Sequence, residues 1–90
     1  MRQAKSAAKL FDQILAETPP ELKKQLDMSF AIADKLDAIL KERGMNQKEF
    51  AQMIGHSQAE VCRWLSGTHN FTLATLAKIS VALGVNLITV

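Results

Sequence analysis

The chain has 90 residues, of which 48% are hydrophobic and 22% are charged. This length fits one small domain and excludes a two-domain enzyme with a cleft between its lobes. The composition is also too apolar for a disordered chain. Lys and Arg number 11 against 9 Asp and Glu, so the net charge is +2, which neither requires nor excludes an anionic partner.

The compartment can be predicted from what the sequence lacks. Cys62 is the single cysteine and has no partner for an intramolecular disulfide, which fits a reducing compartment. No apolar run approaches the ~18 residues of a membrane span, and the first ten residues lack the apolar core of a signal peptide. We therefore expect a cytoplasmic protein that is not bound to a membrane.

Two segments open the chain. Residues 1–18 are predicted to hold an amphipathic helix over about 3–16, because five apolar side chains recur there at helical spacing (Ala7, Leu10, Phe11, Ile14 and Leu15). A second helix is expected to start at Thr18-Pro19-Pro20-Glu21, with Thr18 as the cap and Pro19 as the first helical residue, and to run to Gly44.

Three shorter helices with capping signals follow. Asn46 and Glu49, then Ser57 and Glu60, have the spacing of a capping box, and Thr72 precedes the last apolar helical run. Residues 85–90 are rich in β-branched side chains. They form either an irregular segment or a strand that pairs with another chain, because a lone strand leaves its backbone unpaired.

The stretch from Gln47 to Gly67 predicts a function. Two helices of about 8 and 9 residues flank the turn Gly55-His56-Ser57, which is the geometry of a helix-turn-helix that inserts its second helix into the DNA major groove. Apolar side chains at helical spacing are expected to face inward (Phe50, Ile54, Val61 and Trp64). The base-reading face is then Ser57, Gln58, Ala59, Cys62 and Arg63, where Gln can pair with adenine and Arg with guanine.

Residues 36–88 resemble the Cro/repressor-like (Xre family) helix-turn-helix domains. The similar residues are Gln47-x-x-Phe50-Ala51-x-x-Ile54-Gly55, Ser57-Gln58, Val61, Trp64, Gly67 and Leu73-x-x-Leu76-x-x-Ile79-x-x-Ala82-Leu83-Gly84. The resemblance implies an all-α, five-helix DNA-binding bundle over 19–90, with an extra N-terminal helix and a short C-terminal extended segment. It also implies that Gln47 binds phosphate and braces Gln58, and that the loop with Thr68 and Asn70 meets the DNA backbone. Lys48 supplies a local cation for the same purpose.

The whole chain is similar to HigA-type antitoxins, which repress their own operon and bind a small RelE/HigB-like toxin. We therefore expect a sequence-specific DNA-binding transcriptional regulator that acts as a homodimer and autorepressor. The dimer surface could come from residues 3–16, from the last helix or from residues 85–90. A stand-alone or phage-type repressor without a toxin is one alternative.

A second alternative is a helix-turn-helix-derived module that binds protein and not DNA. The low positive charge favours it, as does Glu60 near the reading face, although Glu60 also completes the capping box of Ser57. Enzyme chemistry finds no support, because no nucleophile has a base and an orienting acid nearby. The spacing of His56, Cys62 and His69 does not suit a metal site, and no cofactor is expected.

Overall fold

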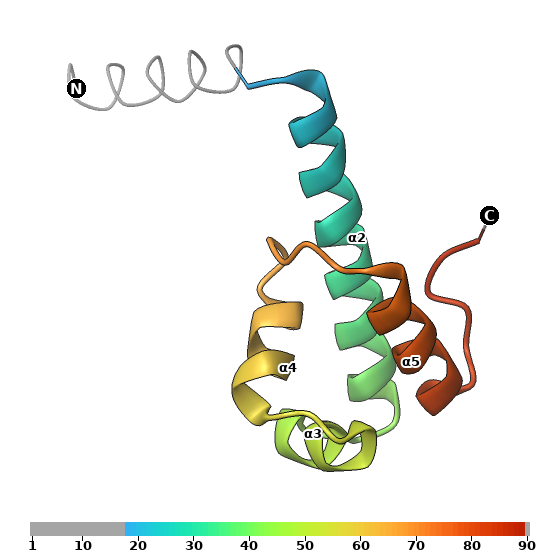
Figure 1. Ribbon diagram of the computed structural model, residues 1–90. Helices are drawn as coiled ribbons and strands as arrows, with labels where there is room; N and C mark the ends of the chain where they lie inside the picture. Colours follow the sequence, from blue (N-terminus) through green and yellow to red (C-terminus); the bar gives the residue numbers. More distant parts are fainter. Residues whose placement is uncertain (1–17, 90) are drawn as a thin grey trace.

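The computed structural model describes residues 18–89, which form an all-α fold as predicted. This part of the chain contains four helices: α2 (Pro20–Glu42), α3 (Gln47–Ile54), α4 (Gln58–Leu65) and α5 (Leu73–Leu83) (Figure 1). The predicted count of five helices in the bundle is therefore wrong. The helix predicted over 3–16 lies outside the described residues.

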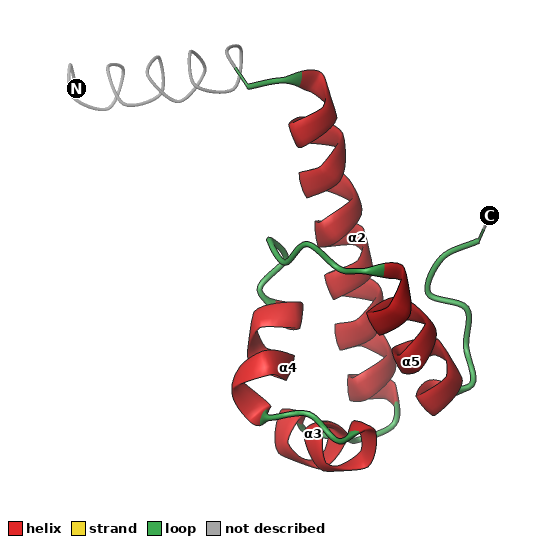
Figure 2. Cartoon of the chain, in the orientation of Figure 1, coloured by secondary structure: helices red, strands yellow, loops and turns green. Residues whose placement is uncertain are grey.

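The described end of the chain adds no further helix or strand. Gly84 ends α5 in the left-handed conformation, and residues 85–89 then continue without helix or strand (Figure 2). Leu87 is buried in the core, its N–H donates to Ser80 Oγ at 3.4 Å, and Lys35 Nζ donates to the Asn86 carbonyl at 2.7 Å. These contacts hold the described part of the tail on its own domain, so the irregular alternative is the one observed.

The start of α2 also differs from the prediction. Pro19, and not Thr18, is the N-cap residue, and the helix begins at Pro20. Pro19 has φ −55° and ψ 140°, because the ring of the following proline disfavours the helical conformation for the residue before it. The predicted N-cap at Thr18 and helix start at Pro19 are therefore each one residue too early, although Glu21 still lies in the first turn, where an acidic group suits the helix dipole.

The core lies between the C-terminal half of α2 and the three shorter helices. It is formed by twelve apolar residues: Ile32, Leu36, Leu40, Phe50, Ala51, Ile54, Val61, Trp64, Leu76, Ile79, Leu83 and Leu87. The predicted inward positions of α3 and α4 are all among them, and this confirms the helical spacing that was used to assign them. Leu36, Phe50, Val61 and Ile79 are fully buried.

The N-terminal half of α2 extends beyond this core (Figure 1). Leu22 and Met28 are exposed there, although both are large and apolar. Phe30 is 46% exposed, and its ring lies against Gly67, the residue that follows the C-cap Ser66 of α4. Gly67 has φ +92°, and a Cβ atom at this position would overlap the Phe30 ring. Gly67 thus lets α2 pack closely on the loop that follows α4.

Candidate nucleic-acid interface

The two helices α3 and α4 are joined by the three-residue turn 55–57. Gly55 takes φ 76°, a left-handed conformation that glycine adopts without strain, and its N–H donates to the Ala51 carbonyl. Both predicted capping boxes are present, from Asn46 to Glu49 on α3 and from Ser57 to Glu60 on α4. Local sequence signals therefore set where each of the two helices begins.

Packing beneath the turn fixes how α3 and α4 are placed on the domain. The rings of Phe50 and Trp64 meet edge to face with their centroids 6.3 Å apart. Ala51 is buried between the helices, where a small side chain allows a close approach. Because these inward residues hold α4 against the core, its opposite face is presented to solvent in a defined orientation.

That opposite face carries the predicted base-reading residues. Gln58, Ala59, Cys62 and Arg63 are all exposed on α4. Ser57 is exposed as well, but its hydroxyl accepts from the Glu60 N–H at 3.1 Å and lies 3.2 Å from Glu60 Oε1. Its hydrogen-bonding capacity is therefore largely used in capping α4.

The predicted phosphate-binding residues are spread over two places. Gln47 and Lys48 are the first two residues of α3, where Gln47 is half-buried and Lys48 is exposed. Within the described residues, neither the Gln47 nor the Gln58 side chain makes a hydrogen bond to another protein group. The bracing of Gln58 by Gln47 stays a prediction. Both amides remain available to a ligand.

The other two phosphate-binding predictions fall in the loop after α4. Thr68 is exposed, with its hydroxyl 3.3 Å from Ser66 Oγ and its N–H donating to that same oxygen at 3.4 Å. This arrangement fixes the start of the loop beside the C-terminus of α4. Asn70 is exposed at the edge of an apolar groove between α2 and α5, so it lies next to a different surface feature.

A polar chain centred on His56 was not predicted from the sequence. His56 Nδ1 lies 2.9 Å from Glu60 Oε2, and Lys78 Nζ lies 3.2 Å from His56 Nε2. With a proton on Nδ1, His56 donates to Glu60 and accepts from Lys78 on α5. The imidazole also meets the Trp64 ring edge to face, with the centroids 4.9 Å apart. The spacing of His56 and Glu60, four residues apart at the start of a helix, is the signal that could have indicated part of this chain.

The hydrogen bonds from His56 and Ser57 determine the charge state and the orientation of the Glu60 carboxylate. The hydrogen bond from His56, followed by that from the Ser57 backbone, lowers the pKa of the Glu60 carboxyl below its ordinary value of 4.5. The carboxylate is therefore charged at neutral pH, but its oxygens are occupied by His56 and by the cap of α4. Glu60 supports the turn, and its charge is directed toward these protein donors.

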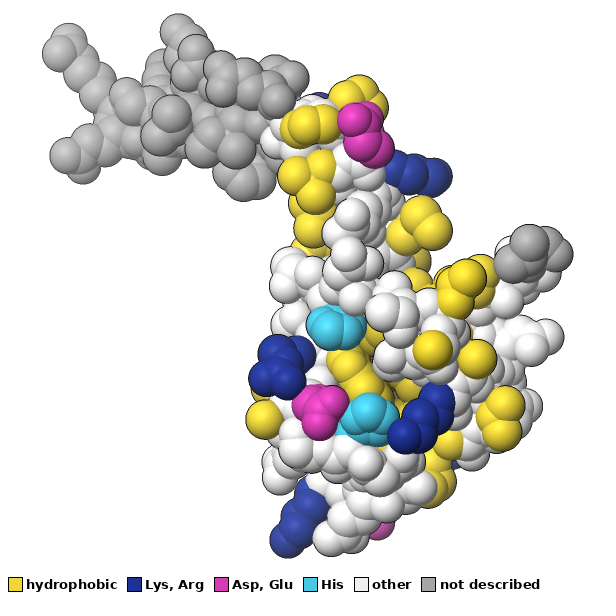
Figure 3. All heavy atoms as spheres, viewed as in Figure 1, with side chains coloured by type: hydrophobic (Ala, Val, Ile, Leu, Met, Phe, Trp, Pro, Cys, Tyr) yellow, Lys and Arg dark blue, Asp and Glu magenta, His cyan; other side chains and the backbone are white. Residues whose placement is uncertain are grey.

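Positive charge is not concentrated on the face of the domain that Figure 3 shows. On the face shown in Figure 3, the Lys and Arg side chains are separated by polar and apolar groups and form no continuous basic patch. Affinity for a polyanion would therefore depend on a few placed cations, such as Arg63 and Lys48, rather than on a broad positive field.

Residues 18–89 contain neither a cluster of metal-ligating side chains nor a membrane-spanning helix. No group of three or more His, Cys, Asp or Glu side chains is gathered there in a way that could hold a metal ion. No helix among these residues is both long and apolar enough to cross a membrane.

These features define a helix-turn-helix domain: a short helix, a glycine turn and a capped second helix with an exposed polar face. Comparison with protein families agrees, since the model described as Helix-turn-helix matches residues 36–89. The chain belongs to this family of Cro/C1-type, Xre-like DNA-binding domains. Searches of curated proteins and of solved structures gave no match to this chain.

Proposed function

We propose that this protein is a sequence-specific transcriptional regulator that inserts α4 into the major groove of DNA as a homodimer. One observation carries the proposal: the exposed face of α4 offers Gln58, Arg63 and small side chains, while the single carboxylate of that helix is held by His56 and Ser57. The base edges lie between two rows of negatively charged phosphates. A helix face without a free carboxylate can approach them because the phosphates do not repel it.

Each exposed residue of α4 has a role in this proposal. Gln58 is suited to a bidentate pair with adenine and Arg63 to one with guanine. Ser57, Ala59 and Cys62 are small enough for the helix to approach the bases closely. Gln47, Lys48, Thr68 and Asn70 fix the register through phosphates, which position the protein without specifying sequence.

The small net charge of +2 supports a dimeric form. With one cationic phosphate contact from each copy, at Lys48, a dimer neutralises about two phosphates, and the logarithm of its affinity falls with the logarithm of salt with a slope of about −2. A two-fold dimer would read a palindrome with half-sites about 34 Å apart. Autorepression and the pairing with a RelE/HigB-like toxin are further proposals that rest on the resemblance to HigA-type antitoxins.

The test is binding of purified protein to DNA by fluorescence anisotropy, at two salt concentrations. Selection from a random duplex library supplies the preferred site, and the DNA upstream of the protein's own coding sequence tests autorepression separately. We expect tight binding to the selected duplex and weak binding to a scrambled one. Arg63→Glu should weaken specific binding by at least about 100-fold, since it removes a base contact worth about 1–3 kcal/mol and adds a repelling charge.

The matched control is Lys23→Glu. It makes the same change in net charge at an exposed residue of α2, in the half that extends away from α4. If both variants lose affinity equally, binding follows total charge and α4 does not read bases. If the wild-type protein selects no sequence and binds no duplex at low salt, the alternative of a protein-binding module replaces the proposal.

A further inference from the structure

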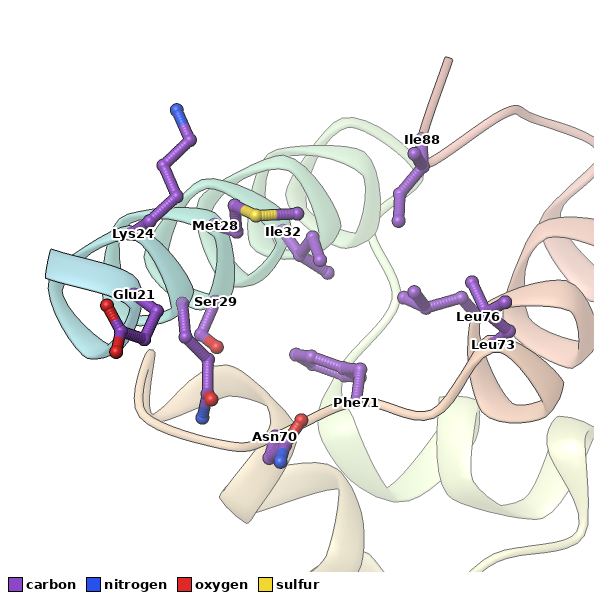
Figure 4. Close-up of a pocket in the computed structure, with 11 residues that line it drawn as sticks. Glu21, Lys24, Met28, Ser29, Ile32, Asn70, Phe71, Leu73, Leu76 and Ile88 are labelled. Atoms are coloured by element: carbon purple, nitrogen blue, oxygen red, sulfur yellow. The ribbon is translucent and has the colours of Figure 1, made fainter. Parts of the chain in front are cut away.

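An apolar groove borders the N-terminal half of α2. It has a volume of about 330 Å³ and lies between α2, the loop at Phe71, the start of α5 and the tail. Six apolar side chains line it: Met28, Ile32, Phe71, Leu73, Leu76 and Ile88. Figure 4 shows Met28, Ile32, Phe71 and Leu76 around a common space, with Leu73 at its edge. Met28 and Leu73 are 49% and 80% exposed, so among residues 18–89 nothing covers this apolar surface fully.

The polar groups around the groove permit an apolar occupant. Ser29 is the single polar side chain that is buried among residues 18–89, and it lines the groove. A helical serine can turn its hydroxyl to the carbonyl group one turn earlier, here that of Gln25, so it does not need a hydrogen bond from the occupant. Glu21, Lys24 and Asn70 are exposed and can remain in water at the rim.

Residues 3–16 have the sequence pattern of an occupant for this groove. At about 100° per residue, their large apolar side chains fall on one face of a helix together with Ala7 (Leu10, Phe11, Ile14 and Leu15). The opposite face is polar (Lys5, Lys9, Asp12 and Gln13). A helix of this length is marginal in water by itself, so it needs a surface that covers its apolar face.

The connection to α2 brings this segment to the mouth of the groove. Pro19 is extended, with φ −55° and ψ 140°, so α2 does not continue back through it. A connection over residues 17–19 has the length of a loop between two antiparallel helices. Glu21 and Lys24, near the start of α2, already line the groove. The segment can therefore reach the groove by folding back along α2.

The lengths of the two surfaces agree. In an antiparallel pair with this loop, Leu15 lies beside the first turn of α2 and Ala7 lies beside Met28. The stripe from Leu15 to Ala7 is about 12 Å long, and α2 from Glu21 to Met28 is about 11 Å long. The short connection also gives the segment an effective concentration on the order of millimolar, so that even a weak contact is formed within one chain.

A second groove, on the other flank of α2, fits this segment less well. Four described residues line it, of which Lys23 and Asp27 are charged and Leu26 and Phe30 are apolar. An apolar helix in this groove would remove water from both charged groups without replacing their hydrogen bonds, which is unfavourable. The first groove is therefore the better match to the apolar face of residues 3–16.

We propose that residues 3–16 form a helix that folds back along α2 and docks its apolar face in the first groove of its own chain. This interaction goes beyond the proposed function and requires no DNA. Because Phe71 lines the groove, the docked segment also restrains the loop that carries Thr68 and Asn70.

The first experiment measures disulfide formation within the full chain in a Cys62→Ser background, so that no other thiol is present. Ala7→Cys with Met28→Cys places one thiol on each surface, and a disulfide requires Cα atoms within about 7 Å. Ala7→Cys with Asp27→Cys is the matched control, because Asp27 is adjacent to Met28 but lines the second groove. Equilibration with glutathione gives the effective concentration of each thiol pair, and we expect a value at least about 10-fold higher for the first pair.

The second experiment changes the segment in the chain that carries the first cysteine pair. Phe11→Asp should lower the effective concentration at least about 10-fold, because it places a charge in the middle of the docked face. Lys9→Gln makes the same change in net charge on the polar face and should leave the value unchanged. Neither residue belongs to the core of the described domain, so circular dichroism should show that α2–α5 remain folded in both variants.

Each other outcome overturns the proposal. Equal values for the two cysteine pairs would mean that the segment docks on neither flank of α2, and a higher value for the pair with Asp27→Cys would place it in the second groove. Disulfides that join two chains on a denaturing gel would mean that the groove receives the segment of another copy. An unchanged value with Phe11→Asp would mean that the apolar face does not make the contact. Because no DNA is present, none of these results depends on whether α4 reads bases.

Discussion

Replacing Gly67 by alanine tests whether α2 and the loop after α4 are coupled as the packing indicates. Three effects set the expected size. A residue with a Cβ atom at φ +92° is strained by about 1–2 kcal/mol. The new methyl group must also displace the Phe30 ring. Because this side chain is about half exposed, it contributes about half of the burial free energy of a fully buried Phe, and displacing it costs about 1 kcal/mol. Alanine also lowers the conformational entropy of the unfolded chain relative to glycine, which stabilises the folded state by about 0.5 kcal/mol.

Gly67→Ala should therefore lower the free energy of unfolding by about 2 kcal/mol, a large share of the ~5–10 kcal/mol expected for a domain of this size. The assay is urea unfolding followed by circular dichroism and by fluorescence of Trp64, which is the single tryptophan and is buried. All variants must be compared at one protein concentration, because dimerisation contributes to apparent stability.

A double-mutant cycle with Phe30→Ala separates the two contributions. Once the ring is removed, only the backbone strain of Gly67→Ala remains, so the double variant should be more stable than the sum of the single changes predicts, by about 1 kcal/mol. If the two changes are additive, the Phe30 ring does not lie against Gly67. If Gly67→Ala costs less than about 0.5 kcal/mol, the left-handed conformation of this residue is also refuted.

Two further predictions concern the helix-turn-helix. Asn46→Ala should destabilise the protein by about 1 kcal/mol in thermal or urea unfolding, because it removes the acceptor that caps the Glu49 N–H at 2.8 Å. Asn46→Asp keeps that acceptor and serves as the control. A loss of stability of similar size in both variants would refute the capping role. Glu60→Gln should remove an acid-sensitive part of the stability. The pKa of Glu60 is lowered in the folded state, first by the hydrogen bond from His56, so its stabilisation is present above the unfolded value and is lost as the pH falls below about 4.5. Stability curves of wild type and Glu60→Gln that stay parallel between pH 3 and 6 would contradict this prediction.

Local signals allowed the helix-turn-helix to be predicted from the sequence. The caps at Asn46, Ser57 and Thr72 depend on side chains within three residues of the backbone groups that they satisfy, and all three are present. The buried positions Phe50 and Trp64 follow from helical spacing alone. Such features need no knowledge of how distant segments meet.

The features that were missed depend on contacts across the chain. The His56 chain includes Lys78, 22 residues away, so its full extent has no local signature. The tail docks through Leu87 and Lys35, and these distant contacts favour the irregular segment over the strand that its composition also allowed. The leucines of α2 are buried at Leu36 and Leu40 but exposed at Leu22, because the helix is longer than the core beneath it. Periodicity indicates a face and cannot indicate how much of that face is covered.

Amide NMR of isotopically labelled protein tests whether the outer face of α4 meets the DNA bases. Spectra would be recorded while the duplex chosen by library selection is added. The largest shifts are expected over Gln58–Arg63 and at Gln47 and Lys48. Shifts that are confined to α5 and the N-terminal half of α2, with the amides of α4 unchanged, would contradict the claim.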